Sequence, residues 1–471
     1  MDKNLKALII IGIIMGASLG FLVVFYLYIS YSNYFSNELG WIWMSGSTTI
    51  DVNGIYGTNG VPSPANLPGG RYGAVSWMDS NDNLWLFGGE GYSESGEKDL
   101  LNDLWKFDGV TWTWMSGNKT TNINGVYGTK GVPSPLNYPG SREGAVSWTD
   151  SSNNLWLFGG DGYPESGGSG DLNDLWKFDG ENWTWISGSK SLYEQGVYGT
   201  RGVPDAANHP GSRNYAVSWI DSDDNLWLFG GEGLPESGFG WYLNDLWKFD
   251  GVNWTWISGN KTTASCGIYG IKGIPNAENY PGSRSDAVSW IDSDDNLWLF
   301  SGIGYSTSSS KGSLNDLWKF NGANWTWVSG HKILDLNGVH GIKYVPDQAN
   351  FPGSRYGAVS WIDSQDNLWL FGGFGYPEFG VSGELKDLWK FDGSTWTWLS
   401  GKRILNFYEN YGVYGIKGVL SMGNIPGARR HAISWTDSDD NLWLFGGRGY
   451  AGSVREGILN DLWKYDTNLF N

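Results

Sequence analysis

The chain has 471 residues, a formal net charge of −18, 31 tryptophans and one cysteine. The negative charge argues against nucleic acid as a partner, because binding to a phosphate backbone requires a basic surface. The single cysteine, Cys266, excludes an internal disulfide. It is either a free thiol or, in an oxidising compartment, one half of a bridge between two molecules.

The N-terminal segment has the character of a membrane anchor. Residues 7–30 carry no charge and are rich in Ile, Leu, Val and Phe. A helix of this length rises about 36 Å, enough to cross a hydrocarbon core of about 30 Å. Lys3 and Lys6 precede the segment and the next basic residue is Arg71. The positive-inside rule therefore predicts a cytoplasmic tail (1–6), a signal-anchor helix (7–30) and a linker (31–40).

A cleaved signal peptide is the competing interpretation of this segment. Both interpretations export the rest of the chain. We expect a single-pass membrane protein whose main domain is extracellular, luminal or periplasmic, with a secreted protein as the alternative.

From residue 41 onward the sequence is a repeat. The segment Asn/Lys-Asp-Leu-Trp-Lys-Phe/Tyr begins at residues 102, 173, 244, 315, 386 and 460, which gives four intervals of 71 residues and one of 74. A fixed period predicts structural units that bury their faces against one another. Thirty of the 31 tryptophans occupy repeated positions, and the exception is Trp241.

Each unit contains four short predicted strands. In the second unit these are residues 143–148, 154–158, 175–178 and 183–185, which are rich in aromatic and β-branched residues and bounded by Gly, Asn and Asp. The connections at 150–154 and 179–182 have the chemistry of hairpin turns. The other two connections, within and between units, are long. Alternating strand directions place the two short turns at one end and the two long loops at the other.

The two ends of the repeat are complementary. The last unit stops at residues 462–465 and lacks the Trp-x-Trp segment that follows in every other unit. The one unpartnered Trp-x-Trp lies at Trp41-Ile42-Trp43. A repeat with complementary ends is most simply a ring. The sequence therefore predicts an all-β fold over residues 41–466, a six-bladed β-propeller of four-stranded blades closed by its N-terminal strand, followed by a tail at 467–471.

The unit resembles the kelch repeat. The carrying motifs are Pro-Gly-Ser-Arg-x-x-Ala-Val-Ser-Trp, Asn-Leu-Trp-Leu-Phe-Gly-Gly and Asp-Leu-Trp-Lys-Phe, since kelch units have an Arg before the first strand, Gly-Gly after the second and aromatic residues later. The chain departs from that pattern at Ser301-Gly302 and in a period longer than the usual spacing of about 50 residues. The resemblance implies a propeller of the galactose-oxidase/kelch type. The copper oxidases of that type need a Tyr–Cys crosslink and two His, which one loop cysteine and four scattered histidines do not supply. We therefore expect no metal and no cofactor.

Candidate ligand-binding residues lie at the predicted long-loop end. One Arg recurs before each first strand, and ring symmetry predicts an anion-attracting collar of Arg71, Arg142, Arg213, Arg284, Arg355 and Arg429. The alternative is that each Arg holds blades together through a neighbouring carboxylate or carbonyl. The positions after this Arg differ between units and are specificity candidates: Tyr72, Glu143, Tyr215, Asp286, Tyr356, Arg430 and His431. Trp241, flanked by aromatic residues, could stack on a ligand or pack on the adjacent loop.

Two functions follow as expectations. The first is a membrane-anchored, extracytoplasmic binding protein that presents its long-loop face to a protein or glycan, because large loops on a rigid scaffold commonly carry binding. The second is an exported sugar-active enzyme similar to the kelch-type sialic acid epimerases, in which Glu143, Asp286, Arg430 and His431 would supply acid–base groups. Whether the chain is an enzyme stays open, although no catalytic motif stands out from the repeat.

Overall fold

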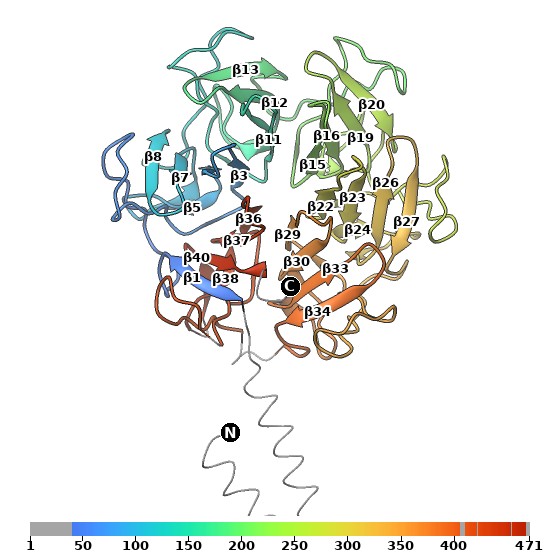
Figure 1. The fold of residues 1–471 in the computed structure, drawn as a ribbon. Coiled ribbons are helices and arrows are strands. Elements are labelled where there is room, and N and C mark those ends of the chain that lie inside the picture. Colours follow the sequence, from blue (N-terminus) through green and yellow to red (C-terminus); the bar gives the residue numbers. More distant parts are fainter. Residues whose placement is uncertain (1–39, 406–409, 422, 454, 468–471) are drawn as a thin grey trace, which may run out of the picture.

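The computed structural model describes residues 40–405, 410–421, 423–453 and 455–467. Every regular element in these ranges is a β-strand, and six blade sheets are arranged as a ring around a central axis (Figure 1). The predicted cytoplasmic tail, anchor helix and nearly all of the linker fall on residues 1–39, outside the described residues. Among the residues that are described, none forms a helix long and apolar enough to cross a membrane.

Each blade is a four-stranded antiparallel sheet. Blade 1 consists of β3 (Val75–Met78), β4 (Leu84–Phe87), β7 (Leu104–Phe107) and β8 (Trp112–Ser116). Blade 2 consists of β10 (Val146–Thr149), β11 (Leu155–Gly162), β12 (Gly170–Phe178) and β13 (Trp183–Ser187). Blade 3 consists of β15 (Val217–Ile220), β16 (Leu226–Phe229), β19 (Leu246–Phe249) and β20 (Trp254–Ser258). Blade 4 consists of β22 (Val288–Ile291), β23 (Leu297–Phe300), β26 (Leu317–Phe320) and β27 (Trp325–Ser329). Blade 5 consists of β29 (Val359–Ile362), β30 (Leu368–Phe371), β33 (Leu388–Phe391) and β34 (Trp396–Ser400). Blade 6 consists of β36 (Ile433–Thr436), β37 (Leu442–Phe445), β40 (Leu462–Tyr465) and β1 (Trp41–Ser45).

The predicted ring closure is confirmed. Strand β1 pairs antiparallel with β40, with Trp41 opposite Tyr465 and Trp43 opposite Trp463. The Trp41 side chain is fully buried and also packs edge-on against Phe371 of blade 5, with ring centroids 5.4 Å apart. The N-terminal strand therefore completes blade 6 and joins it to blade 5.

The predicted first strand of each unit is in fact two strands separated by a kink. In blade 2, β9 (Arg142–Glu143) is separated from β10 by Gly144, whose φ is 61°. The short strand before the kink pairs with a hairpin made from the long connection between the second and third strands. The prediction of one continuous first strand was therefore wrong, because a left-handed residue breaks the extended backbone.

The kink gives each blade a second, smaller sheet at its long-loop end. In blade 2 the small strand pairs with an extension of β11, which in turn pairs with an extension of β12. Elsewhere the small sheets are separate: β2 (Arg71–Tyr72), β5 (Glu90–Tyr92) and β6 (Lys98–Leu100); β14 (Arg213–Asn214), β17 (Glu232–Gly233) and β18 (Trp241–Tyr242); β21 (Arg284–Ser285), β24 (Ile303–Tyr305) and β25 (Lys311–Ser313); β28 (Arg355–Tyr356), β31 (Phe374–Gly375) and β32 (Gly383–Glu384); β35 (Arg429–Arg430), β38 (Arg448–Tyr450) and β39 (Glu456–Ile458).

The loops between blades line the outer edge of the ring instead of crowding its long-loop face. Gly60 donates its backbone N–H to the carbonyl of Trp114 at 2.8 Å, and the Asn66 amide donates to the carbonyl of Trp112 at 3.1 Å. Equivalent bonds recur in the other blades. The outermost strand of a blade would otherwise expose unpaired backbone groups. These loops donate hydrogen bonds to carbonyls of that edge strand. The small sheets therefore form most of the long-loop face.

The core lies between blades. In one interface, Trp77 and Phe87 of blade 1 pack with Leu157, Trp176 and Trp183 of blade 2. The same aromatic cluster recurs around the ring. Because each blade buries both faces against its neighbours, the repeated tryptophans hold the ring together without disulfides.

Candidate binding site on the long-loop face

The six repeated arginines are buried and do not form a collar around the channel. Arg213 is 1% exposed and forms two parallel hydrogen bonds to the Asp245 carboxylate, each 2.8 Å long. Two further N–H groups donate to the carbonyls of Gly211 and Gly230. The other pairs are Arg71–Asp103, Arg142–Asp174, Arg284–Asp316, Arg355–Asp387 and Arg429–Asp461.

This geometry corrects both expectations for the arginines. A guanidinium that is buried and already paired with a carboxylate is not accessible to a ligand, so these six residues do not form an anion-attracting collar. The carboxylate partner also belongs to the same blade and not to a neighbour. Burial alone would raise the pKa of the Asp316 carboxyl, but the charge and hydrogen bonds of Arg284 hold it below its usual value. Each pair therefore fixes the small sheet of a blade to that blade's third strand.

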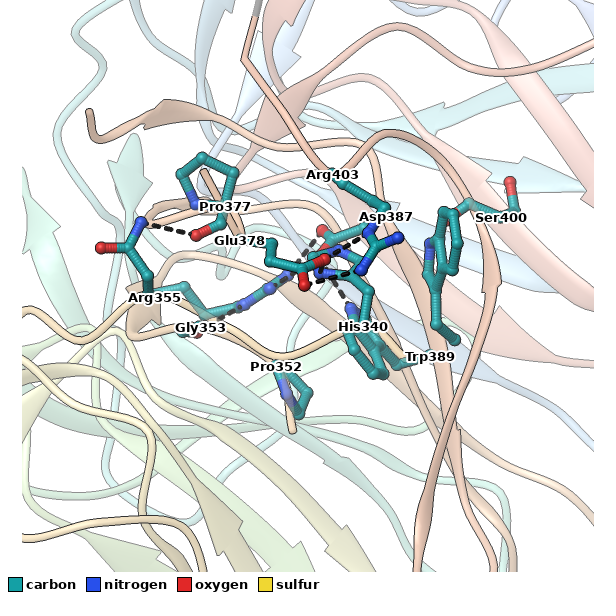
Figure 2. A network of polar contacts seen from close by, with 12 residues as sticks. His340, Pro352, Gly353, Arg355, Pro377, Glu378, Asp387, Trp389, Ser400 and Arg403 are labelled. Atoms are coloured by element: carbon teal, nitrogen blue, oxygen red, sulfur yellow. Dashed lines mark hydrogen bonds and ion pairs between the residues drawn. The ribbon is translucent and has the colours of Figure 1, made fainter. Parts of the chain in front are cut away.

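Blade 5 contains a variation of this network (Figure 2). In the other five blades a tyrosine hydroxyl donates to the same aspartate, as in the 2.6 Å bond from Tyr198 to Asp245. In blade 5 the tyrosine is replaced by His340, which is fully buried between Asp387 and Glu378. Its ring nitrogens lie 3.6 and 3.4 Å from the nearest oxygens of those carboxylates. Because the network recurs in every blade, its role is structural.

A closed ring of six backbone hydrogen bonds surrounds the axis at the kinks. The N–H of Gly144 donates to the carbonyl of Gly73, Tyr215 donates to Gly144, and the series returns when Gly73 donates to His431. The bonds are 2.7–3.1 Å long. The members are Gly73, Gly144, Tyr215, Asp286, Gly357 and His431, all with φ between 46° and 62°. A non-glycine residue in this region costs roughly 1–2 kcal/mol, so three blades accept strain at the axis.

The three side chains on this ring make the centre of the face asymmetric. Tyr215 donates its hydroxyl to Glu143 at 3.0 Å, and its ring centroid lies 5.0 Å from that of His431. The His431 Nε2 atom lies 2.8 Å from Asp286 Oδ1. Glycine is needed opposite these rings, because a Cβ atom on Gly357 would lie 2.6 Å from the His431 ring. The predicted residues Glu143, Tyr215, Asp286 and His431 thus come together.

Around this centre, each small sheet presents one row of residues that does not repeat between blades. Residues paired directly across a sheet point to the same face. The rows are Tyr72–Glu90–Leu100, Glu143–Asp161–Asp171, Asn214–Glu232–Tyr242, Ser285–Ile303–Ser313, Tyr356–Phe374–Glu384 and Arg430–Arg448–Ile458. The flanking Arg, Gly and Leu residues repeat in every blade.

Sequence reasoning found the first column of these rows and missed the other two. The missed columns directly follow the Gly-Gly motif and directly precede the repeated Leu-Asn/Lys-Asp-Leu-Trp segment. A usable signal existed, because both positions vary within an otherwise repetitive unit. What the sequence did not reveal was that the intervening residues form a hairpin that brings all three columns together.

The rows of blades 1 to 3 are acidic. Their carboxylates are Glu90, Glu143, Asp161, Asp171 and Glu232. The pKa of Glu143 is raised to about 7, mainly by burial and then by the nearby charge of Glu90. The hydrogen bond from Tyr215 lowers this pKa, but by less than Glu90 raises it. Burial likewise raises the pKa of Asp171 to about 6. This half of the site therefore carries partly desolvated carboxyl groups that repel one another, although Glu90 also pairs with Lys98 at 2.5 Å.

The basic residues of the site are already paired. Arg430 of blade 6 forms an ion pair with Glu384, which is 4% exposed. Burial raises the pKa of Glu384 to about 8 even though Arg430 opposes the shift. Arg448 pairs with Glu456 at 2.8 Å. The site as a whole is therefore better matched to a cationic or neutral group than to an anion.

Aromatic side chains border the site in blades 3 to 5. Tyr356 packs against Phe374, with centroids 5.4 Å apart, and the Arg430 guanidinium lies over Phe374. Trp241 is 42% exposed and donates its Nε1–H to the Tyr305 hydroxyl of blade 4 at 3.0 Å. Trp241 therefore packs on the adjacent blade, the second of the two expectations, and leaves part of its ring on the surface.

No family model matches this chain, and no curated protein matches it. Among solved structures, the protein YjhT is 14% identical over 84% of this chain and 96% of its own, with a TM-score of 0.47. A fungal alcohol oxidase of the AA5 family, in complex with copper, is 13% identical over 89% of this chain and 77% of its own, with a TM-score of 0.44. A protein of unknown function from Dyadobacter fermentans is 7% identical over 91% of this chain and 98% of its own, with a TM-score of 0.47. Similarity at this level transfers neither a ligand nor an activity.

Proposed function

We propose that the chain is a kelch-like binding propeller, anchored through residues 7–30, that presents its long-loop face outside the cytoplasm to a glycan or protein ligand. The observation that carries this proposal is the concentration of non-repeating residues in one place. The eighteen positions in these six rows vary around the ring, with Tyr shared by blades 1 and 5 in the first column and Glu by blades 1 and 3 in the second, and they surround the asymmetric Tyr215–Asp286–His431 centre. Binding is the function that needs such a surface on an otherwise repetitive scaffold.

The chemistry of the site points to a ligand rich in hydroxyl or amine donors. Blades 1 to 3 supply half-buried carboxyl groups, and the pKa values of Glu143, Asp161, Asp171 and Glu232 are raised, chiefly by burial. A bound ammonium or hydroxyl donor would offset their mutual repulsion. An acidic sugar would add to it, because the six repeated arginines are paired with aspartates. Tyr356 and Phe374 supply an aromatic border on which a sugar ring can stack.

Titration calorimetry against three oligosaccharides tests the proposal. We expect the amine-bearing chitosan tetramer to bind most tightly, neutral cellotetraose more weakly and sialyllactose least. Replacing Glu143→Gln removes one charge and keeps the acceptor for Tyr215, so affinity for the amine ligand falls roughly 10- to 100-fold. Glu165→Gln, at an exposed carboxylate bonded to Lys190, is the matched control. Tighter binding of sialyllactose than of the chitosan tetramer would refute the ligand assignment.

A second candidate function is acid–base chemistry on a sugar. The observation favouring it is that Glu143, with a pKa of about 7, and the hydrogen-bonded His431–Asp286 pair lie on either side of Tyr215. Two protonatable groups on one substrate would allow a proton to leave one atom as another arrives. Exchange-NMR of anomeric interconversion on a sugar panel tests this, with Glu143→Gln and His431→Ala as inactive variants. Rates equal to the uncatalysed reaction on every sugar would exclude this activity for that panel.

A further inference from the structure

A cavity lies on the axis at the opposite, short-turn end of the ring. The cavity has a volume of about 410 Å³ and is lined by the Ser-Trp-x segments at the ends of the innermost strands. The ring of six backbone hydrogen bonds and the side chains of Tyr215, Asp286 and His431 lie beyond it, toward the long-loop face. The cavity is thus a funnel that opens on the short-turn face, separate from the site described above.

The wall of the funnel offers apolar surface and few free polar groups. Four of the five lining serine hydroxyls already donate to a carbonyl of the preceding blade, as when Ser218 donates to the carbonyl of Ser147 and Ser289 donates to that of Ser218. Toward the mouth the lining residues are Met78, Thr149, Ile220, Ile291, Ile362 and Thr436. A sugar would find few partners here. An aliphatic side chain would bury its surface against this wall.

The turns that border the mouth are strongly acidic. Turns 79–83, 150–154, 221–225, 292–296, 363–367 and 437–441 contain fourteen aspartates, and the turns at the outer strands add Asp108, Asp179, Glu181, Asp250, Asp392 and Asp466. The third strands bring one lysine per blade: Lys106, Lys177, Lys248, Lys319, Lys390 and Lys464. Twenty carboxylates against six lysines leave −14 at this face, out of −18 for the whole chain.

Part of this acidity is used by the fold. Asp295 accepts hydrogen bonds from the backbone N–H and the hydroxyl of Ser222 in the preceding blade, and Ser293 bonds Asp366 in the same way. These bonds join the turns of neighbouring blades into a collar around the mouth. The collar holds the negative charge in place around an apolar opening.

We propose that the funnel is a second binding site, for a basic peptide segment whose aliphatic side chain enters the cavity while flanking Lys or Arg side chains lie over the aspartate turns. The charge extends from the inner turns to the outer turns, wider than one small cation can span. The volume of about 410 Å³ holds a few side chains and not a folded domain. Charge complementarity around an apolar pocket is the arrangement that captures such a segment.

Fluorescence anisotropy with a dye-labelled Lys-Lys-Leu-Lys-Lys-Leu-Lys-Lys peptide tests the proposal on the full chain. We expect saturable binding that weakens as salt rises, and at least tenfold weaker binding when both leucines are replaced by glycine. Ile291→Lys places a cation in the funnel wall and should weaken binding at least tenfold. Thr149→Lys is a second funnel variant in case the first fails to fold. Ile271→Lys, which adds the same charge at an exposed loop residue, is the matched control.

Several results would overturn the proposal. One is equal binding by the funnel variants and Ile271→Lys, and another is equal binding of the leucine-free peptide, since both mean non-specific attraction to an acidic surface. A third is tetrabutylammonium binding as tightly as the peptide, and a fourth is a sedimenting dimer that the funnel variants dissociate. Glu143→Gln leaves peptide binding unchanged if the two faces are independent, so failure at one site is distinguishable from failure at the other.

Discussion

Replacing Glu143→Gln should stabilise the protein in a pH-dependent way. The pKa of Glu143 rises from 4.5 to about 7 on folding, chiefly through burial. A carboxyl group with a raised folded pKa contributes stability that is fully present below pH 4.5 and is lost as the pH rises through 7. At 1.36 kcal/mol per pKa unit the loss amounts to about 3 kcal/mol. Glutamine carries no charge at any of these pH values and still accepts the Tyr215 hydrogen bond.

The assay is equilibrium urea unfolding, followed by tryptophan fluorescence at pH 4.5, 6 and 8. We expect the variant and the parent to unfold alike at pH 4.5, and the variant to be more stable by about 3 kcal/mol at pH 8. Glu165→Gln should change stability by less than about 1 kcal/mol at each pH, because its carboxylate forms an exposed ion pair with Lys190. A Glu143→Gln effect of the same size at pH 4.5 and pH 8 would refute the reasoning.

Three further changes probe the scaffold by the same unfolding assay. Asp245→Asn leaves the buried charge of Arg213 uncompensated and should cost about 3–5 kcal/mol; a cost under 1 kcal/mol would contradict the role assigned to the pair. His340→Tyr restores the hydroxyl that the other five blades direct at this aspartate, here Asp387, and should add about 1 kcal/mol, whereas any loss of stability would contradict it. Trp41→Ala removes a fully buried ring at the seam and should cost about 3–5 kcal/mol, with faster hydrogen exchange in the last strand; unchanged exchange there would argue against closure by this strand.

The architecture was predictable from the repeat itself. A constant period and complementary ends define a closed ring, and the unpartnered Trp41–Trp43 segment identified the strand that completes blade 6. The strands themselves were predictable from aromatic and β-branched runs between turn residues. These signals are local or periodic, so one sequence is sufficient to detect them.

The role of the arginines was not predicted, although their spacing in the sequence contained a signal. Each arginine precedes its aspartate partner by 32 residues in every blade, as in Arg213 and Asp245, so a constant offset was present in the sequence. The constant offset is explained only by the folded structure, in which the arginine in the short strand before each kink lies beside the aspartate that precedes the third strand. That kink is glycine in three blades and Tyr215, Asp286 or His431 in the others, which concealed a shared left-handed backbone behind dissimilar residues.

The hydrogen-bonded ring at the kinks also bears on how the face responds to a ligand. Tyr215, Asp286 and His431 hang from peptide groups that are links in a circuit with no free end. Moving any one of these side chains strains the backbone hydrogen bonds that its residue makes to the kinks of both neighbouring blades. The strain is therefore shared around the ring and not confined to one loop. We therefore expect a ligand bound at the axis to slow hydrogen exchange at the kinks of all six blades together, including blades whose side chains do not touch it.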